Sequence, residues 1–355
     1  MPKRIGIVTL YGTLNYGNRL QNLAIHTCLA KRGFIPETIV WRPKRLKWYF
    51  YPAWILVKSR IFKDPKTSRT NNFLRFIRKY TPDRAYFSKD HSVPRKICDR
   101  YDYFVTGSDQ VWNVRLLGAS KRIEAYFLTF AEDRKKICIS PSIGESRVGD
   151  ANAAWMREKL QGFRYLSCRE KQGAEELSRI TGQPCEWLID PTLSITGDEW
   201  RKLLSIRPES RKKPYLFVFF LDGMTPELTQ FVREYAANRY EIIDPSDSSG
   251  PWFSIDPAMF VTLLSGAHMV FTDSFHVTAF SINFHVPFHV FTRKRVKGMT
   301  SRIESICELC QLQSRYIPEQ KPFEIQETCD FSQADRQLAV EREKFSAYLD
   351  KCFEA

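Results

Sequence analysis

The feature that most limits the possible folds is a repeated change in hydrophobic periodicity along the chain. Runs rich in β-branched and aromatic residues alternate with segments whose apolar residues recur every three or four positions. A first run at 4–10 precedes a Gly- and Asn-rich loop at 12–18, and helical spacing then continues to Gly33. Such alternation is typical of parallel sheets covered by helices, so the sequence predicts an α/β fold. Further strands are expected at 36–41, 101–106, 136–142, 165–169, 185–189, 215–220, 239–243, 269–272 and 287–291.

The length of the chain predicts two domains. Its 355 residues are about twice the usual size of one domain. A polar and basic stretch, 194–214, precedes a new apolar strand and is the expected linker. We therefore expect an N-terminal domain over 1–193, a C-terminal domain over 215–331 and a closing helix over 332–355.

Positive charge is concentrated in one segment. The net charge is +14, and the basic-aromatic segment 42–69, an expected insertion in the N-terminal domain, holds nine basic residues and one acidic residue. Three interpretations are open: contact with an anionic membrane, binding of nucleic acid, or packing on its own domain. Charge gathered in one segment, rather than along a nucleic-acid module, argues against a nucleic-acid partner.

The composition also favours a cytoplasmic protein. Nine scattered cysteines are not the pattern expected of a secreted disulfide framework, and the apolar run at 5–10 is too short for a signal peptide. Charged and polar residues interrupt 257–292, the best candidate for a spanning helix. We expect a cytoplasmic location, with peripheral contact at the membrane face through 42–69.

Loops that follow predicted strands carry most of the candidate functional residues, because ligands of open parallel sheets bind at the carboxyl ends of the strands. The loop at 12–18 suits an anion at a helix N-terminus, or is a tight turn with a capping Asn. At the second loop, Ser108 and Asp109 either bind ligand or cap the next helix. At the third, Arg169 suits a phosphate or carboxylate, or pairs structurally with Glu170.

The fourth loop has the densest group of reactive side chains. Asp273, Ser274 and His276 stand within four residues, between a predicted strand and a predicted helix. Histidine is the side chain best suited to proton exchange near neutral pH, so this cluster favours a catalytic role. A metal site is not expected, since Cys307 and Cys310 form one isolated CxxC pair without a suitably spaced His.

Taken together, these loops resemble those of the polysaccharide pyruvyl transferase family. The likeness covers about 4–310 in the family's order, with two departures: Val277 stands where members usually have Gly, and 140–144 differs from the common Ala-Ser-Phe-Gly type. The residues that carry it are Gly12-Thr13-Leu14-Asn15-Tyr16-Gly17-Asn18-Arg19-Leu20-Gln21, Tyr101-Asp102, Gly107-Ser108-Asp109-Gln110-Val111-Trp112-Asn113, Cys168-Arg169-Glu170, Leu188-Ile189-Asp190-Pro191-Thr192-Leu193 and Thr272-Asp273-Ser274-Phe275-His276-Val277-Thr278-Ala279-Phe280-Ser281.

The resemblance implies two Rossmann-like domains facing a cleft, similar to the B-type glycosyltransferase fold. It also implies pyruvyl transfer from phosphoenolpyruvate to sugar hydroxyls of a surface polysaccharide or its lipid-linked precursor, as in exopolysaccharide biosynthesis for the cell envelope. The product is a pyruvate ketal, and phosphoenolpyruvate is the donor substrate, with no cofactor or metal required. The alternative is a glycosyltransferase that uses a nucleotide sugar on the same scaffold.

The same resemblance implies roles for particular residues. His276 is the expected acid/base, with Asp109 its candidate partner. The remaining expectations are donor-binding residues, namely Arg169, Asp273, Ser274 and Phe275, and residues that line the cleft, namely Asn15, Asn18, Gln21 and Ser108.

Overall fold

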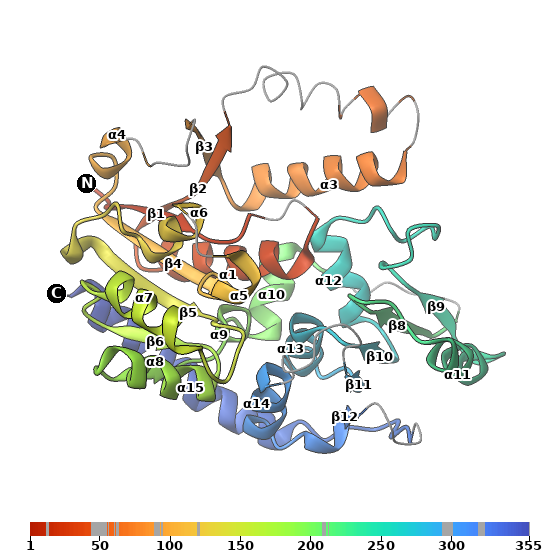
Figure 1. The fold of residues 1–355 in the computed structure, drawn as a ribbon. Coiled ribbons are helices and arrows are strands. Elements are labelled where there is room, and N and C mark those ends of the chain that lie inside the picture. The colour runs from red at the N-terminus through yellow and green to blue at the C-terminus, as the bar shows by residue number, and fades with distance from the viewer. Residues whose placement is uncertain are drawn as a thin grey trace. The chain divides into compact units, whose positions relative to one another are not determined.

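The computed structural model describes residues 1–11, 14–43, 55, 57–59, 61, 64–88, 93, 95–118, 121–207, 211, 213–292, 301–318 and 324–354. The chain forms two compact units, each built on its own parallel sheet (Figure 1). Unit 1 comprises 1–57, 74–194 and 341–355, and unit 2 comprises 58–73 and 195–340. The predicted α/β class with two parallel sheets is confirmed.

The main sheet of unit 1 has the strand order β3-β2-β1-β4-β5, and every neighbouring pair is parallel. Two short strands that follow β5 in the sequence, β6 and β7, form a separate parallel pair. The Arg169 amide, directly after β6, donates to the Pro141 carbonyl at the end of β5 at 3.2 Å. The strands are β1 (Arg4–Val8), β2 (Ile35–Pro43), β3 (Asp83–Ser88), β4 (Tyr103–Asp109), β5 (Lys136–Pro141), β6 (Leu166–Cys168) and β7 (Cys185–Trp187).

Helices and loops that connect the strands of unit 1 share one apolar core, to which two of the helices contribute Met156 and Leu177. The indole of Trp112 is fully buried, with the Phe127 ring stacked on it at 5.6 Å between centroids. Burial of rings of this size dominates the energy of such a core. The helices are α1 (Tyr16–Ala30), α4 (Arg95–Cys98), α5 (Val114–Leu117), α6 (Lys121–Glu124), α7 (Asp150–Leu160), α8 (Lys171–Thr181) and α9 (Pro191–Ser194).

Unit 2 repeats this architecture with the strand order β12-β11-β10-β8-β9, again wholly parallel. Its strands are β8 (Tyr215–Phe219), β9 (Glu241–Ile243), β10 (Met269–Thr272), β11 (Phe288–Phe291) and β12 (Tyr316–Ile317). Its helices are α10 (Gly197–Leu204), α11 (Pro226–Ala236), α12 (Pro257–Ser265), α13 (Phe275–Asn283) and α14 (Ser301–Leu309). Two further helices, α3 (Pro65–Tyr80) and α15 (Ser332–Phe353), contribute residues to both units.

The expected linker at 194–214 needs correction, because unit 2 already begins at Ile195. Thr196 caps α10 with a capping box, and the fully buried Trp200 packs on Phe280 at 5.1 Å between ring centroids. The polar face of this amphipathic helix made the segment resemble a linker, while its apolar face belongs to the core of unit 2.

Two other expected boundaries differ from the structure. Residues 58–69 of the basic-aromatic segment belong to unit 2, where Arg69 donates to the Pro245 and Phe253 carbonyls at 3.3 Å each. The closing helix α15 is also divided, and from Glu341 onward it belongs to unit 1. There Tyr348 is buried, and its hydroxyl donates to the Cys138 carbonyl at 3.0 Å. Residues 44–54, 56, 60, 62 and 63 of the basic-aromatic segment lie outside the described residues.

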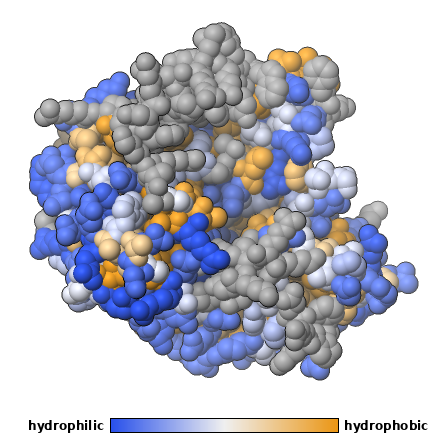
Figure 2. All heavy atoms as spheres, viewed as in Figure 1, coloured by the Kyte–Doolittle hydropathy of each residue, from blue (hydrophilic) through white to orange (hydrophobic). Residues whose placement is uncertain are grey.

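Among the residues coloured in Figure 2, most of those on the visible face are hydrophilic, and hydrophobic residues appear there in separate patches. Within the described parts of the chain, no helix has the length and apolar character needed to cross a membrane.

Candidate functional site

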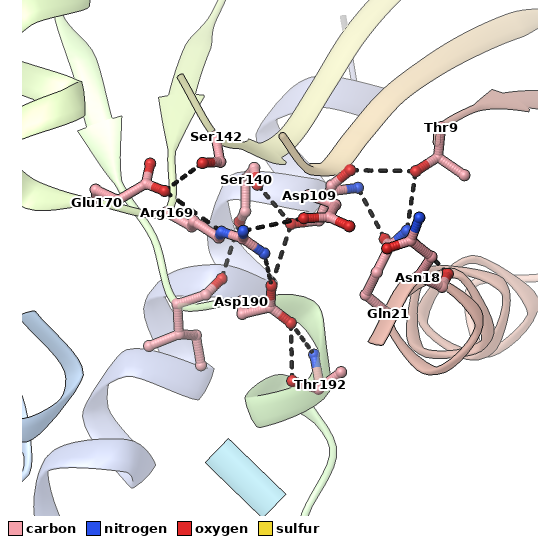
Figure 3. Close-up of polar contacts among 12 residues, drawn as sticks. Thr9, Asn18, Gln21, Asp109, Ser140, Ser142, Arg169, Glu170, Asp190 and Thr192 are labelled. Atoms are coloured by element: carbon pink, nitrogen blue, oxygen red, sulfur yellow. Dashed lines mark hydrogen bonds and ion pairs between the residues drawn. The ribbon is translucent and has the colours of Figure 1, made fainter. Parts of the chain in front are cut away.

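Unit 1 gathers polar side chains where its strands end (Figure 3). Asp109 ends β4, Arg169 follows β6, and Asp190 follows β7. Because parallel strands present their carboxyl ends at one edge of a sheet, residues more than 80 positions apart in the sequence meet here. We call Asp109, Arg169, Glu170 and Asp190 the carboxylate cluster.

Arg169 is the centre of this cluster, and its side chain is fully buried. Its Nη1 donates to Asp190 Oδ2 at 2.8 Å, and its Nη2 donates to Asp109 Oδ1 at 3.1 Å. Its Nε lies 3.5 Å from Glu170 Oε1. Burial alone would lower the pKa of Arg169, but the three carboxylates raise it above its ordinary value. The guanidinium is therefore charged and held by groups of the chain itself.

Asp190 connects the cluster to the neighbouring loops. Its Oδ1 accepts from the Thr192 amide at 3.0 Å and the Thr192 hydroxyl at 2.8 Å, at the start of α9. Its Oδ2 also accepts from the Ser108 hydroxyl at 3.3 Å. Asp190 thus fixes the positions of Arg169 and Ser108 together.

Gln21 of α1 extends this network toward β1. Its Oε1 accepts from the Ser108 amide at 3.0 Å, and its Nε2 donates to the Thr9 hydroxyl at 2.9 Å. The Thr9 hydroxyl in turn donates to the Ser108 carbonyl at 3.1 Å. Gln21 and Ser108 are both fully buried. These contacts connect α1 to the end of β4.

Glu170 anchors the other side of the cluster. Its Oε1 accepts from the Ser142 hydroxyl, and its Oε2 accepts from the Cys168 thiol at 3.1 Å. Burial first, and then the Glu170 carboxylate, raise the pKa of Cys168 well above its ordinary value. This cysteine is therefore a neutral structural thiol rather than a nucleophile.

The two asparagines of the first loop have structural positions at the start of α1. Asn15 is the N-cap, and its side chain accepts from the Asn18 amide at 3.1 Å. Asn18 lies within the first turn and is buried. A capping Asn of this kind satisfies one of the amides left unbonded at a helix start. The capping Asn of the turn interpretation is Asn15, and α1 begins at Tyr16, within the range 12–18 that was expected to be loop.

Unit 2 presents the fourth loop as a turn between β10 and α13. Asp273 is buried, and its carboxylate accepts from the Leu221 amide at 2.7 Å and the Asp222 amide at 3.3 Å. Thr272 accepts from the Ser274 amide at 3.0 Å through its hydroxyl oxygen. Asp273 therefore holds the loop after β8, so its carboxylate positions the backbone instead of presenting a negative charge to an anionic donor.

His276 lies in the first turn of α13 and is half-buried. Its ring meets the Phe275 ring edge to face at 5.3 Å between centroids. Ser274 is the N-cap residue, but its side chain makes no capping hydrogen bond. Val277 is 1% exposed, so its side chain is directed into the interior of unit 2. The turn thus combines an imidazole with a helix N-terminus whose cap hydroxyl is not used for capping.

The structure brings the predicted residues together in two sets. Gln21, Ser108, Asp109 and Arg169 form one network in unit 1, and 273–276 form one turn in unit 2. Arg169 was expected to face the donor phosphate. In the structure its guanidinium is instead surrounded by three carboxylates of the chain itself. The pairing of His276 with Asp109 joins residues of different units and stays a prediction.

Sequence reasoning gave no role to Asp190 or Arg19. Asp190 stands in an Asp-Pro-Thr string, which is typical of a helix start, and its second role as a partner of Arg169 has no local signal. Arg19 lies in the first turn of α1 and is fully buried, which is unusual for an arginine, and its burial became evident only in the structure. Among the described residues, no three His, Cys, Asp or Glu side chains form a group able to hold a metal ion.

Two parallel five-stranded sheets with polar loops at the carboxyl ends define an α/β protein of the Rossmann-like class. The family model described as polysaccharide pyruvyl transferase matches residues 15–295, and the chain belongs to this family. The expected family membership is confirmed, and with it the coarser assignment to a family of transferases that act on polysaccharides.

Several solved structures are similar to the chain at low sequence identity. A putative UDP-N-acetylglucosamine 2-epimerase from Listeria monocytogenes is 12% identical over 88% of this chain and 89% of that one, with a TM-score of 0.47. MnaA from S. aureus, solved with UDP, is 10% identical over 98% and 90%, with a TM-score of 0.49. The glycosyltransferase SnogD from Streptomyces nogalater is 10% identical over 99% and 96%, with a TM-score of 0.38. None of the curated proteins matches the chain at a significant level.

Proposed function

We propose that the protein transfers a pyruvyl group from phosphoenolpyruvate to two hydroxyls of a sugar, forming a cyclic ketal. The acceptor is a surface polysaccharide or its lipid-linked precursor. The observation that carries the proposal is the family match over 15–295, which includes the His276 turn. The proposal needs a proton donor and fixed hydrogen-bond donors for an anionic substrate.

His276 is the proposed proton donor. Its proton goes to the methylene carbon of phosphoenolpyruvate, which leaves positive charge on the adjacent carbon. A sugar hydroxyl attacks that carbon and gives its proton to a base. The bond between that carbon and the phosphate oxygen then breaks, and a second hydroxyl closes the ketal while its proton passes to the departing phosphate. The N-terminus of α13 supports this role, because the first amides of a helix favour an anion and the Ser274 side chain does not occupy them as a cap.

Asp109 is the proposed base, which accepts a hydrogen bond from the attacking sugar hydroxyl and then takes its proton. Its Oδ1 pairs with Arg169, and it keeps 6% of its surface exposed at the end of β4. Arg169 then acts through Asp109 as a positioning residue, which replaces its expected role as a ligand of the donor phosphate.

The direct test is phosphate release from phosphoenolpyruvate, together with the melting temperature of the protein in the presence of candidate donors. We expect phosphoenolpyruvate to raise the melting temperature, because a ligand of the folded state stabilises it in proportion to occupancy. We also expect phosphate release to require a glycan acceptor. A response to a uridine or guanosine nucleotide sugar without any response to phosphoenolpyruvate would contradict the proposal and favour a glycosyltransferase.

We also propose that the protein works at the cytoplasmic face of an anionic membrane. Helix α3 supports this partner, because its buried side includes Phe73 and Phe76 while its exposed side includes Arg75 and Arg78. All the charged residues of α3 are basic. Nearby in the sequence, Ile61 is 68% exposed. A basic helix face beside an exposed apolar residue suits anionic headgroups.

Charge reversal on α3 tests this partner. We expect Arg75→Glu with Arg78→Glu to weaken sedimentation with phosphatidylglycerol vesicles by about tenfold or more, since each basic residue near such a surface contributes about 1 kcal/mol. The matched control reverses the charges of Arg201 and Lys202, two exposed residues of α10, by replacing both with Glu. It should leave sedimentation unchanged. Equal losses in both variants, or none in the α3 variant, would exclude α3 as the membrane surface.

A further inference from the structure

Arg19 is a buried cation that makes few hydrogen bonds within the described part of the chain. Its side chain belongs to the first turn of α1 and is 0% exposed. Its Nη2 donates to the Leu10 carbonyl at 2.8 Å, and its guanidinium stacks over the Tyr11 ring at 4.5 Å. Among the described residues, neither its Nε nor its Nη1 has a hydrogen-bond partner.

This arrangement is unfavourable for a residue whose role is only structural. A buried N–H without an acceptor costs about 1–3 kcal/mol, and more when the group is charged. Arg169 shows the opposite pattern, because each of its three guanidinium nitrogens faces a carboxylate. Arg19 lies beside the end of β1, at the edge where ligands of a parallel sheet bind. Its unused N–H groups are therefore suited to oxygen atoms of a ligand.

The charges around Arg19 indicate which ligand fits. Asp83 and Asp109 both lie within electrostatic reach of its guanidinium, and Asp83 also accepts a hydrogen bond from the Tyr11 hydroxyl at 2.5 Å. The carboxylate cluster, of which Asp109 is a member, holds three carboxylates and one guanidinium, which leaves an excess of negative charge. An anionic ligand would be repelled by this excess. A sugar is uncharged, and its hydroxyls both accept and donate hydrogen bonds.

We propose that Arg19 binds an uncharged sugar in unit 1, with its Nε–H and Nη1–H groups donating to sugar oxygens and Asp109 accepting from a sugar hydroxyl. The inference rests on the proposed function in taking this sugar to be the pyruvyl acceptor. It assigns the acceptor to unit 1, while the proposed donor residues lie in unit 2.

Saturation-transfer NMR with the methyl glycosides of glucose, galactose, mannose and N-acetylglucosamine tests the inference without phosphoenolpyruvate. We expect at least one glycoside to give transfer signals with the wild-type protein. Arg19→Met should weaken those signals by about fivefold or more, which corresponds to the loss of one or two net hydrogen bonds. Arg19→Lys keeps the charge but has a different donor geometry, so it should give an intermediate loss.

Stability distinguishes a binding residue from a structural one. We expect Arg19→Met to keep its melting temperature within about 2 °C of wild type, or to raise it, because an apolar side chain can replace a poorly satisfied buried charge without loss. The matched control is Arg32→Met, since Arg32 donates to Asp350 at 2.8 Å and to the Ser346 hydroxyl at 2.7 Å. That change should lower the melting temperature more than Arg19→Met and leave the glycoside signals intact.

The inference would be overturned if no glycoside binds the wild-type protein, or if the signals persist in Arg19→Met. It would also be overturned if Arg19→Met is less stable than Arg32→Met. Loss of inorganic phosphate binding in Arg19→Met, instead of loss of sugar binding, would overturn it as well. A failure to release phosphate from phosphoenolpyruvate would contradict the proposed function alone, because neither the NMR measurement nor the melting temperature depends on that reaction.

Discussion

Replacing Arg169 with Met is expected to destabilise unit 1 by about 3–5 kcal/mol, the cost of removing one partner from a buried ion pair. Arg169 is fully buried, and its removal leaves Asp109, Asp190 and Glu170 without their shared cation. Each carboxylate would then carry an uncompensated charge in a site largely shielded from water, which is among the most unfavourable arrangements in a protein. The expected result is a much lower urea midpoint, or a protein that does not fold.

Urea unfolding followed by tryptophan fluorescence measures this effect in the relevant unit. Trp187 is a local reporter, because its indole N–H donates to the Arg169 carbonyl at 3.2 Å. The matched control is Arg201→Met, whose ion pair with Asp198 is largely exposed and should contribute little. A second variant, Asp190→Asn, keeps an oxygen acceptor for Arg169 and should lose less stability than Arg169→Met. A midpoint for Arg169→Met equal to that of the control would show that the cluster does not hold unit 1 together.

The fold was predictable to the extent that its segments carry local periodic signals. The β-branched run at the start became β1, and the apolar run before the His276 turn became β10 with the expected bounds. Two strands had no such signal: β3 begins with Asp83 and Arg84, and β12 has two residues. Both lie at the edges of their sheets, where strands need less apolar sequence.

The division of the chain into units depends on contacts that one sequence does not reveal. The sequence of α10 shows an apolar face that carries Trp200, as in any amphipathic helix. It does not show that this face packs on Phe280. The same holds for α15, where Tyr348 bonds to Cys138 more than 200 residues earlier in the chain. Periodicity predicts that such helices exist and which face is apolar, but it does not predict the surface that the face covers.

The candidate site shows the same limit at the level of single residues. The loops after the strands were found because strand order and loop composition are local properties. The pairing of Arg169 with Asp190 was not predicted, because Asp190 is 21 positions away in the sequence. Its approach to Arg169 depends on how β6 and β7 pair. An arginine at the end of a strand suits an external anion or an internal carboxylate equally well, and only the structure distinguishes the two.

Replacing His276 with Ala is expected to reduce phosphate release from phosphoenolpyruvate by about 10²–10⁴-fold, the usual contribution of a positioned general acid. The reason is that the imidazole is the proposed source of the proton for the methylene carbon, while the N-terminus of α13 is the proposed binding site of the donor. The rate constant kcat should therefore fall with little change in the KM for phosphoenolpyruvate. The melting temperature should change little, because His276 is half-buried and its removal leaves the Asp273 contacts with Leu221 and Asp222 in place.

The matched control is His268→Ala in the same unit, where the imidazole is exposed and meets the Tyr240 hydroxyl at 2.9 Å. It should keep the wild-type rate. Asp273→Asn gives a further contrast, because it disturbs the anchor of the loop after β8 and should raise KM and lower the melting temperature together. A wild-type rate in His276→Ala would remove the imidazole from the chemistry. A large rise in KM with an unchanged kcat would instead make His276 a donor-binding residue, and the proton would then have to come from another group.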